Sequence, residues 1–161
     1  MLEIDLEICK VMAKEAYDGY YRRDGSSMYE HAIRVSNIFG RIGSAPMAAV
    51  ALLHDVLPHT ETTKKDLVDA AIMGNTIELL IDYMKKDDES VLDYYDRLGV
   101  DPILRHIKMA DIVEDLLCEP TEVEYREWQY GMMLLSRCPM RHLKKELIYD
   151  YLDVPGEFRN D

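Results

Sequence analysis

Hydrophobic residues recur along most of the chain at the spacing of three and four positions that is typical of amphipathic helices. In the segment from Leu2 to about Gly19, this pattern includes Leu6, Cys9 and Met12. The same spacing, with cap residues and with Gly and Pro at the breaks, predicts further helices at residues 29–42, 44–58, 64–73, 77–84, 90–98, 101–117, 121–136 and 139–151. The sustained alternation of a β-strand is nearly absent. We therefore expect an all-α fold, a single bundle of about eight or nine short helices over residues 1–161.

The composition is that of a folded, acidic protein. The 161 residues include 19 Lys plus Arg against 31 Asp plus Glu, which gives a formal net charge of −12. The length is sufficient to bury a core without disulfides, and 48% hydrophobic with 31% charged residues is typical of a globular chain. The acidic excess argues against nucleic acid as a partner, because phosphates need a basic footprint. It does not exclude a small phosphorylated ligand held by a metal ion and a few local cations.

Two features indicate the compartment. No hydrophobic run approaches the roughly 18 residues of a membrane span, and the acidic start Met1–Asp5 is unlike a signal peptide. The cysteines, Cys9, Cys118 and Cys138, are scattered and form no CxxC pair, which excludes a zinc ribbon or a redox motif. We expect a cytoplasmic protein with no membrane partner, and the sequence leaves self-association into a homo-oligomer open.

A polar pair, His54-Asp55, closes the very hydrophobic segment 48–56. Burial of these groups requires partners, and two solutions are open: an Asp–His hydrogen bond at a helix end, or ligation of one metal ion by both side chains. His31 in the preceding helix and Asp111 in the apolar segment 103–117 add further donors. Two imidazoles and two carboxylates form a mixed N/O set suited to a divalent cation such as Mn²⁺, Fe²⁺ or Zn²⁺.

The order His31, then His54-Asp55, then Asp111 resembles the H…HD…D signature of the HD-domain metal-dependent phosphohydrolases. The surroundings resemble one branch, the small stand-alone (p)ppGpp hydrolases of the RelA/SpoT type. The similar segments are residues 22–31, 51–55, 108–111 (Lys-Met-Ala-Asp) and 124–128. The resemblance extends over roughly residues 8 to 150, and it implies a single HD-type helical domain.

The resemblance also implies an activity. One divalent metal would be held by His31, His54, Asp55 and Asp111, with Mn²⁺ as the first choice and Fe²⁺, Zn²⁺, Ni²⁺ or Co²⁺ as alternatives. The metal would supply hydroxide for attack on phosphorus, and the substrate of that branch is a guanosine polyphosphate from which the 3′-pyrophosphate is removed. The implied partner is therefore a small phosphorylated nucleotide.

Four polar residues are candidates for substrate contact by the same resemblance. Arg22 and Arg23 would approach the phosphates or stack on the base, and Lys108 lies three positions before the metal-binding Asp111. Asp115 stands where the family usually has an Asn. The alternative for each cation is a solvated surface charge.

The sequence departs from the family about one turn after the metal pair. The hydrolases follow it with Glu-Asp, which handles the attacking water, but this chain has Pro58-His59. Proline cannot perform acid–base chemistry, whereas His59 could act as a base or be linked to the metal. Otherwise Pro58 ends the helix and His59 lies in a solvated loop. Three possibilities therefore stay open: a phosphohydrolase in which His59 and Asp55 are catalytic, a degenerate HD domain that binds nucleotide or metal without turnover, or a helical scaffold with a buried His–Asp pair and no metal.

Overall fold

The structure, a computed structural model, describes residues 3–136 and contains helices joined by loops. Within these residues, the β-type pairing is limited to one isolated bridge between Tyr21 and Ser27. The all-α prediction is therefore confirmed. The chain divides into two compact units, Met1–Met84 and Lys85–Asp161, and the single domain over residues 1–161 stays a prediction. The expected helix at 139–151 lies outside the described residues.

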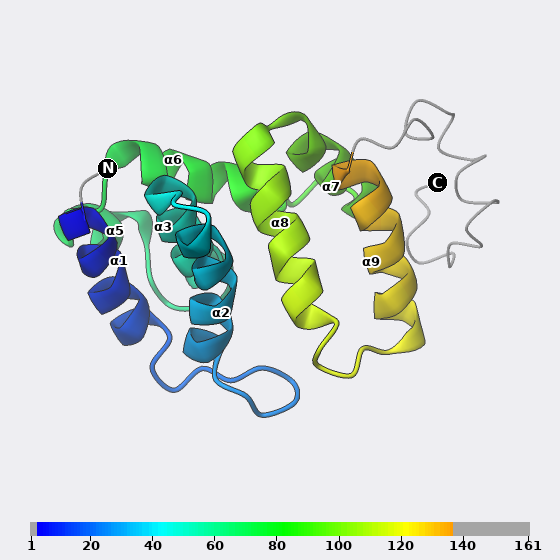
Figure 1. The fold of residues 1–161 in the computed structure, drawn as a ribbon, viewed down its shortest axis with the longest axis horizontal. Helices are drawn as coiled ribbons and strands as arrows, with labels where there is room; N and C mark the ends of the chain where they lie inside the picture. The colour runs from blue at the N-terminus through cyan, green and yellow to red at the C-terminus, as the bar shows by residue number, and fades with distance from the viewer. Residues whose placement is uncertain (1–2, 137–161) are drawn as a thin grey trace. The chain divides into compact units, whose positions relative to one another are not determined.

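The first unit is built around a short hydrophobic helix. Its helices are α1 (Glu3–Ala16), α2 (Met28–Arg41), α3 (Ala45–Leu53), α4 (Val56–His59), α5 (Lys64–Asp69) and α6 (Gly74–Tyr83) (Figure 1). Helices α1, α2 and α6 all pack against α3. Every residue from Ala48 to Leu53 is buried, as expected for a helix that is hydrophobic on all sides. The core of this unit therefore surrounds the helix that leads into His54.

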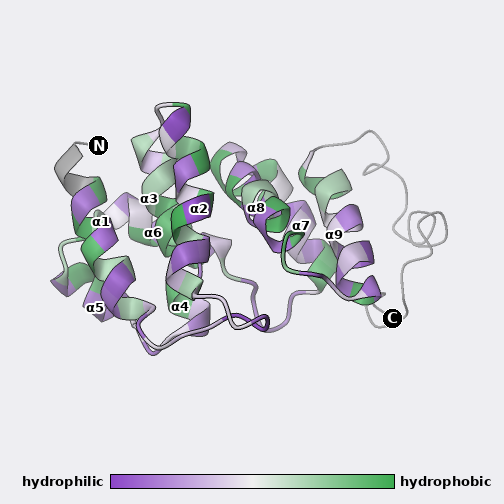
Figure 2. Cartoon of the chain, turned by 60° about the horizontal axis from the view of Figure 1, so that its bottom comes forward, coloured by the Kyte–Doolittle hydropathy of each residue, from purple (hydrophilic) through white to green (hydrophobic). Residues whose placement is uncertain are grey.

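Helix α2 is amphipathic and lies against α3. Its buried side includes Ala32, Val35 and Phe39, and Figure 2 shows hydrophobic and hydrophilic bands on its surface. Ser36 on the same side donates a hydrogen bond of 2.8 Å from its hydroxyl to the carbonyl of Ala48. This buried hydrogen bond joins α2 to α3 and fixes the position of one helix along the axis of the other.

The helix expected at residues 44–58 is interrupted at His54-Asp55, and α4 begins after the break. Pro58 explains the interruption. In a continuous helix, Pro58 could not donate a hydrogen bond to the carbonyl of His54, four positions earlier, and its ring would clash with that carbonyl. Breaking the helix places Pro58 in the first turn of α4, where an N–H has no intrahelical partner to lose. The prediction that Pro58 ends the helix is therefore wrong: Pro58 lies within α4, which begins at Val56 and ends at His59.

Helix α5 is shorter than the predicted 64–73. It begins after a capping box formed by Thr63 and Asp66 and ends at Asp69. The backbone of Ala71 then adopts a left-handed conformation with φ of 61°, and the N–H of Ile72 donates to the carbonyl of Leu67. This is a Schellman-type ending, and glycine is the usual residue at its left-handed position. Because Ala71 is not a glycine, the sequence carries no clear signal that the helix ends there.

The second unit contains α7 (Val91–Val100), α8 (Pro102–Asp115) and α9 (Glu122–Leu135), and each of the three packs against the other two. Their starts follow the sequence closely, because Ser90, Asp101 and Thr121 all accept backbone N–H bonds at the N-caps. Two of the helices approach closely at Gly99 of α7, where an added Cβ would lie 2.9 Å from the carbonyl oxygen of Leu134 in α9.

None of the helices within residues 3–136 combines the length and the hydrophobicity that crossing a bilayer requires. Cys9 is buried and Cys118 half-buried, and both are in the thiol form. Cys138 lies outside the described residues. The cytoplasmic location stays a prediction.

Candidate metal centre

His31 and His54 lie side by side in the first unit. Ser27 caps α2 by accepting the N–H of Glu30, which places His31 in the first turns of that helix. Both histidines are buried, with 2% and 1% of their surface exposed. Their ring centroids are 5.5 Å apart, and each ring offers a ligand atom within 4.8 Å of one on the other. This pair could hold a metal ion, as the sequence suggested.

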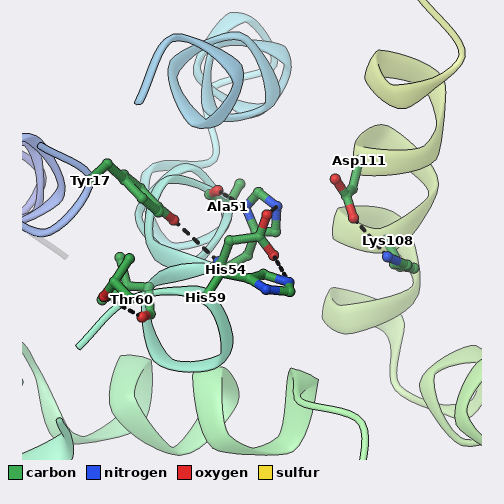
Figure 3. A network of polar contacts seen from close by, with 9 residues as sticks. Tyr17, Ala51, His54, His59, Thr60, Lys108 and Asp111 are labelled. Atoms are coloured by element: carbon green, nitrogen blue, oxygen red, sulfur yellow. Dashed lines mark hydrogen bonds and ion pairs between the residues drawn. The ribbon is translucent and has the colours of Figure 1, made fainter. Parts of the chain in front are cut away.

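A hydrogen bond to the backbone fixes the ring of His54. Its Nδ1 lies 2.6 Å from the carbonyl oxygen of Ala51. A carbonyl oxygen can only accept, so Nδ1 must carry the proton and Nε2 of the neutral ring presents a lone pair. In a continuous helix this carbonyl would accept the N–H of Asp55. That N–H instead donates to the hydroxyl of Tyr17, at 3.2 Å (Figure 3).

Asp55 lies at the break between the two helices, and its carboxylate reaches two imidazoles. One oxygen, Oδ2, is 3.2 Å from Nε2 of His54, and the other, Oδ1, is 3.8 Å from Nε2 of His59. The Asp55 side chain is 20% exposed, the His54 side chain 0% and the His59 side chain 58%. The carboxylate is therefore placed between a buried ring and a solvated one. The sequence interpretation of His59 as a residue in a solvated loop is half right, since its side chain is exposed but belongs to α4.

Two tyrosines complete the surroundings of His54, and sequence reasoning missed both. Tyr17, at the end of the first helical segment, is buried and supplies the hydroxyl described above. Tyr83, at the end of α6, packs its ring against His54 at a centroid distance of 5.6 Å and an interplanar angle of 81°. Neither carries a motif, and both meet His54-Asp55 only through tertiary packing. Their one sequence signal is an aromatic residue at a predicted helix end.

In the second unit, Asp111 and Lys108 lie one turn apart on α8 and are paired. The Nζ of Lys108 is 2.8 Å from Oδ2 of Asp111 (Figure 3). Asp111 is 4% exposed, so the sequence expectation of a carboxylate in core-like surroundings is confirmed. The ammonium also lies 5.9 Å from the ring centroid of Tyr94, within the range of a cation–π contact. Lys108 is therefore a half-buried cation and not a free surface charge.

The second unit also pairs the buried Tyr95 with the half-buried Glu127. The Tyr95 hydroxyl donates to Oε1 of Glu127 at 2.9 Å. Burial raises the pKa of both groups above their ordinary values, and the positive charge of Lys108 acts in the opposite direction on each. Glu127 falls in the segment 124–128 that carries part of the resemblance, so this helix supplies a polar side chain to the interior of its unit.

The remaining candidates for substrate contact occupy less buried positions. Arg22 and Arg23 lie in the turn before α2, where the N–H of Arg22 donates to the carbonyl of Ser26 at 2.8 Å. Arg22 is half-buried and Arg23 exposed. Asp115 is the half-buried last residue of α8, one turn after Asp111. Their roles toward a substrate stay predictions.

Imidazole nitrogen and carboxylate oxygen together suit a divalent transition metal. Burying two neighbouring imidazoles costs free energy, because each ring is polar. Packing alone therefore does not explain why both are buried side by side. The anchored Nδ1 of His54 is also what a metal-binding histidine needs, since a backbone carbonyl commonly fixes the ring so that the second nitrogen can ligate. Comparison with known proteins finds no matching family model and no matching curated protein.

Proposed function

We propose that this protein is a metal-dependent phosphohydrolase of the HD type that acts on a small nucleotide, with a guanosine 3′-pyrophosphate as the first substrate to test. The proposed ligands are His31, His54, Asp55 and Asp111, the last included on the order of the sequence motif alone. A bound divalent cation would lower the pKa of water and supply hydroxide near neutral pH.

The approach of His54 to Asp55 carries this proposal. With Nδ1 donating to Ala51, the Nε2 lone pair and the Asp55 carboxylate face one another at 3.2 Å. Two acceptors at this distance repel unless a proton or a cation lies between them. A proton would make a charged imidazolium in a side chain that is 0% exposed, at a substantial desolvation cost. A divalent cation bound by these groups would remove the repulsion, and His31 offers a second imidazole next to His54.

The cationic residues have a separate task in this proposal, which is to offset substrate charge. A nucleotide carries several negative charges into a chain whose net charge is −12. Guanidinium groups at Arg22 and Arg23 can bind phosphate oxygens in a bidentate manner, and Lys108 can add a point charge. The turn that carries the two arginines precedes α2 and contains no regular helix.

The direct test is a nucleotide panel assayed with and without metal. We expect the full-length protein to release pyrophosphate from guanosine 3′-pyrophosphates in the presence of Mn²⁺, and a chelator to stop the release until Mn²⁺ is restored. The panel also includes nucleoside triphosphates and cyclic nucleotides, which separate anhydride from diester cleavage. A folded, metal-loaded protein that converts no nucleotide in the panel would contradict the enzymatic proposal.

The second candidate function is a binding module without turnover. The specific observation is Pro58, which occupies the first turn of α4 and provides no side chain able to move a proton. Ligands that raise the melting temperature in a thermal-shift screen, while the product assay stays blank, would favour this function.

A double variant distinguishes the two functions further. Pro58→Glu with His59→Asp restores the acidic pair of the hydrolases, and general acid–base catalysis contributes about 10²–10⁴-fold. If the wild type is already the proposed enzyme, we expect its turnover to change by less than about tenfold. A gain of more than about a hundredfold, measured as kcat for the best nucleotide, would show that the wild type lacks its base and acts as a binding module.

A further inference from the structure

Two tyrosines of the first unit, Tyr17 and Tyr20, hold the two ends of the short helix α4. Both lie in the turn that follows α1, where the N–H of Tyr20 donates to the carbonyl of Tyr17 at 3.0 Å. The hydroxyl of Tyr17 accepts the N–H of Asp55, directly before α4, at 3.2 Å. The hydroxyl of Tyr20 accepts the N–H of Glu61, shortly after α4 ends, also at 3.2 Å. One turn of the chain therefore fixes this helix at both ends.

Helix α4 needs such support because it has four residues, too few to form a stable helix on their own. Val56 packs in the core with 0% of its surface exposed, and its carbonyl accepts the N–H of Thr60 at 3.2 Å. The two tyrosine hydroxyls add one hydrogen bond before this turn and one after it. The bond at Asp55 has the larger consequence, because Asp55 directly follows His54.

The imidazole of His54 has a partner for either of its two neutral tautomers. With the proton on Nδ1, the ring donates to the carbonyl of Ala51 at 2.6 Å, and Nε2 presents a lone pair. With the proton on Nε2, the ring would donate to Oδ2 of Asp55, which lies 3.2 Å away, and Nε2 could not bind a metal ion. The first tautomer suits a metal centre, and the second gives an Asp–His hydrogen bond without metal.

We propose that Tyr17 is a positioning residue that selects the tautomer in which His54 can bind a metal ion. The carbonyl of Ala51 is the acceptor that the N–H of Asp55 would use in a continuous helix. Because Tyr17 takes this N–H, the carbonyl is left to the ring of His54. The inference rests on the proposed function for the metal ion itself, whereas the tautomer is a property of the metal-free protein.

The burial of Tyr17 allows its hydroxyl to be removed by itself. The residue is 2% exposed, so phenylalanine at this position would keep the ring packing and delete the acceptor. An N–H in the protein interior that loses its acceptor costs free energy until it finds another one. The N–H of Asp55 would therefore turn to the carbonyl of Ala51. The ring of His54 would then shift toward donation from Nε2 to the Asp55 carboxylate.

The experiment is ¹⁵N NMR of the imidazole rings in the metal-free, full-length protein at about pH 8, where imidazole is ordinarily neutral. We expect protonated Nδ1 for His54 in the wild type and a shift toward protonated Nε2 in Tyr17→Phe. Binding of Co²⁺, followed by its absorption spectrum, should weaken by about 10–100-fold in Tyr17→Phe, the usual cost of removing a group that orients a ligand. Tyr21→Phe is the matched control. Tyr21 belongs to the same segment but is 69% exposed, so both measurements should stay at the wild-type values.

The outcomes separate this inference from the proposed function. A shifted tautomer together with weaker Co²⁺ binding in Tyr17→Phe would confirm the role of Tyr17. An unchanged tautomer, or an unchanged affinity for Co²⁺, in a folded Tyr17→Phe variant would overturn it. Exchange of the Asp55 amide hydrogen in the wild type at the rate of an unfolded chain would also overturn it, and this measurement needs no variant. A wild type that binds no Co²⁺ would contradict the proposed function, and the tautomer alone would then decide the role of Tyr17.

Discussion

Replacing His54 with alanine is expected to abolish the proposed metal binding and to lower the proposed nucleotide hydrolysis by about a thousandfold or more. The substitution deletes the Nε2 ligand, and with it the stabilisation, worth several kcal/mol, that a Lewis acid gives to developing charge. The measurement is metal content by elemental analysis beside kcat for the best nucleotide. Metal content and kcat should fall together, because both depend on the same proposed ligands.

His54 is a buried residue, so its removal also creates a cavity and the variant must be shown to fold. Far-UV circular dichroism and a cooperative unfolding transition serve that purpose, and His31→Ala provides a second route to the same loss. The matched control is His106→Ala, which should retain metal and activity. Wild-type turnover in a folded, metal-free His54→Ala variant would rule out the mechanism.

Replacing Gly99 with alanine is expected to lower the free energy of unfolding by about 2–3 kcal/mol. The added Cβ would lie 2.9 Å from the carbonyl oxygen of Leu134, which belongs to the backbone of α9 and cannot rotate away. Helices α7 and α9 would have to separate, and both contribute buried residues to the core of the second unit. The loss of stability arises from overpacking, because the substitution changes neither charge nor polarity.

Gly40→Ala is the matched control for this prediction. Gly40 lies within α2, and a Cβ there would meet no atom within 4 Å. Alanine is the better helix former, so this variant should gain about 0.5–1 kcal/mol. Urea unfolding followed by circular dichroism compares the two variants. Fluorescence of the single tryptophan, Trp128 in α9, reports on the second unit in the same experiment. A Gly99→Ala variant as stable as the wild type would show that α7 and α9 are not in close contact at this glycine.

The sequence predicted the helices where local chemistry decides them. Ser90, Asp101 and Thr121 are examples of N-caps. Their side-chain oxygens accept backbone N–H groups of the first turn, which lie only two or three positions away in the sequence. The burial of His31, His54 and Asp111 was also predictable, since each interrupts an apolar pattern. The metal role of these residues was an interpretation of a motif, and it stays a proposal.

The break at His54-Asp55 and the contacts of Tyr17 could not be predicted with equal ease. Pro58 was visible, but its effect depends on whether the chain places it at the end of one helix or in the first turn of the next. The bond between Tyr17 and Asp55 joins residues 38 positions apart, and no local pattern encodes such a contact. The same is true of Gly99, whose close neighbour belongs to another helix. Packing decides all three.

The exchange of hydrogen bonds at the end of α3 has a consequence for binding. The His54 ring occupies a carbonyl that the helix would otherwise use itself, and the displaced N–H of Asp55 is taken by Tyr17. The ring orientation is therefore part of the helix ending and does not depend on a bound ion. A ligand held in this way loses little rotamer entropy on binding, so more of the coordination energy appears as affinity. Preorganisation of the proposed centre would thus come from the backbone, where Pro58 lies four residues after His54.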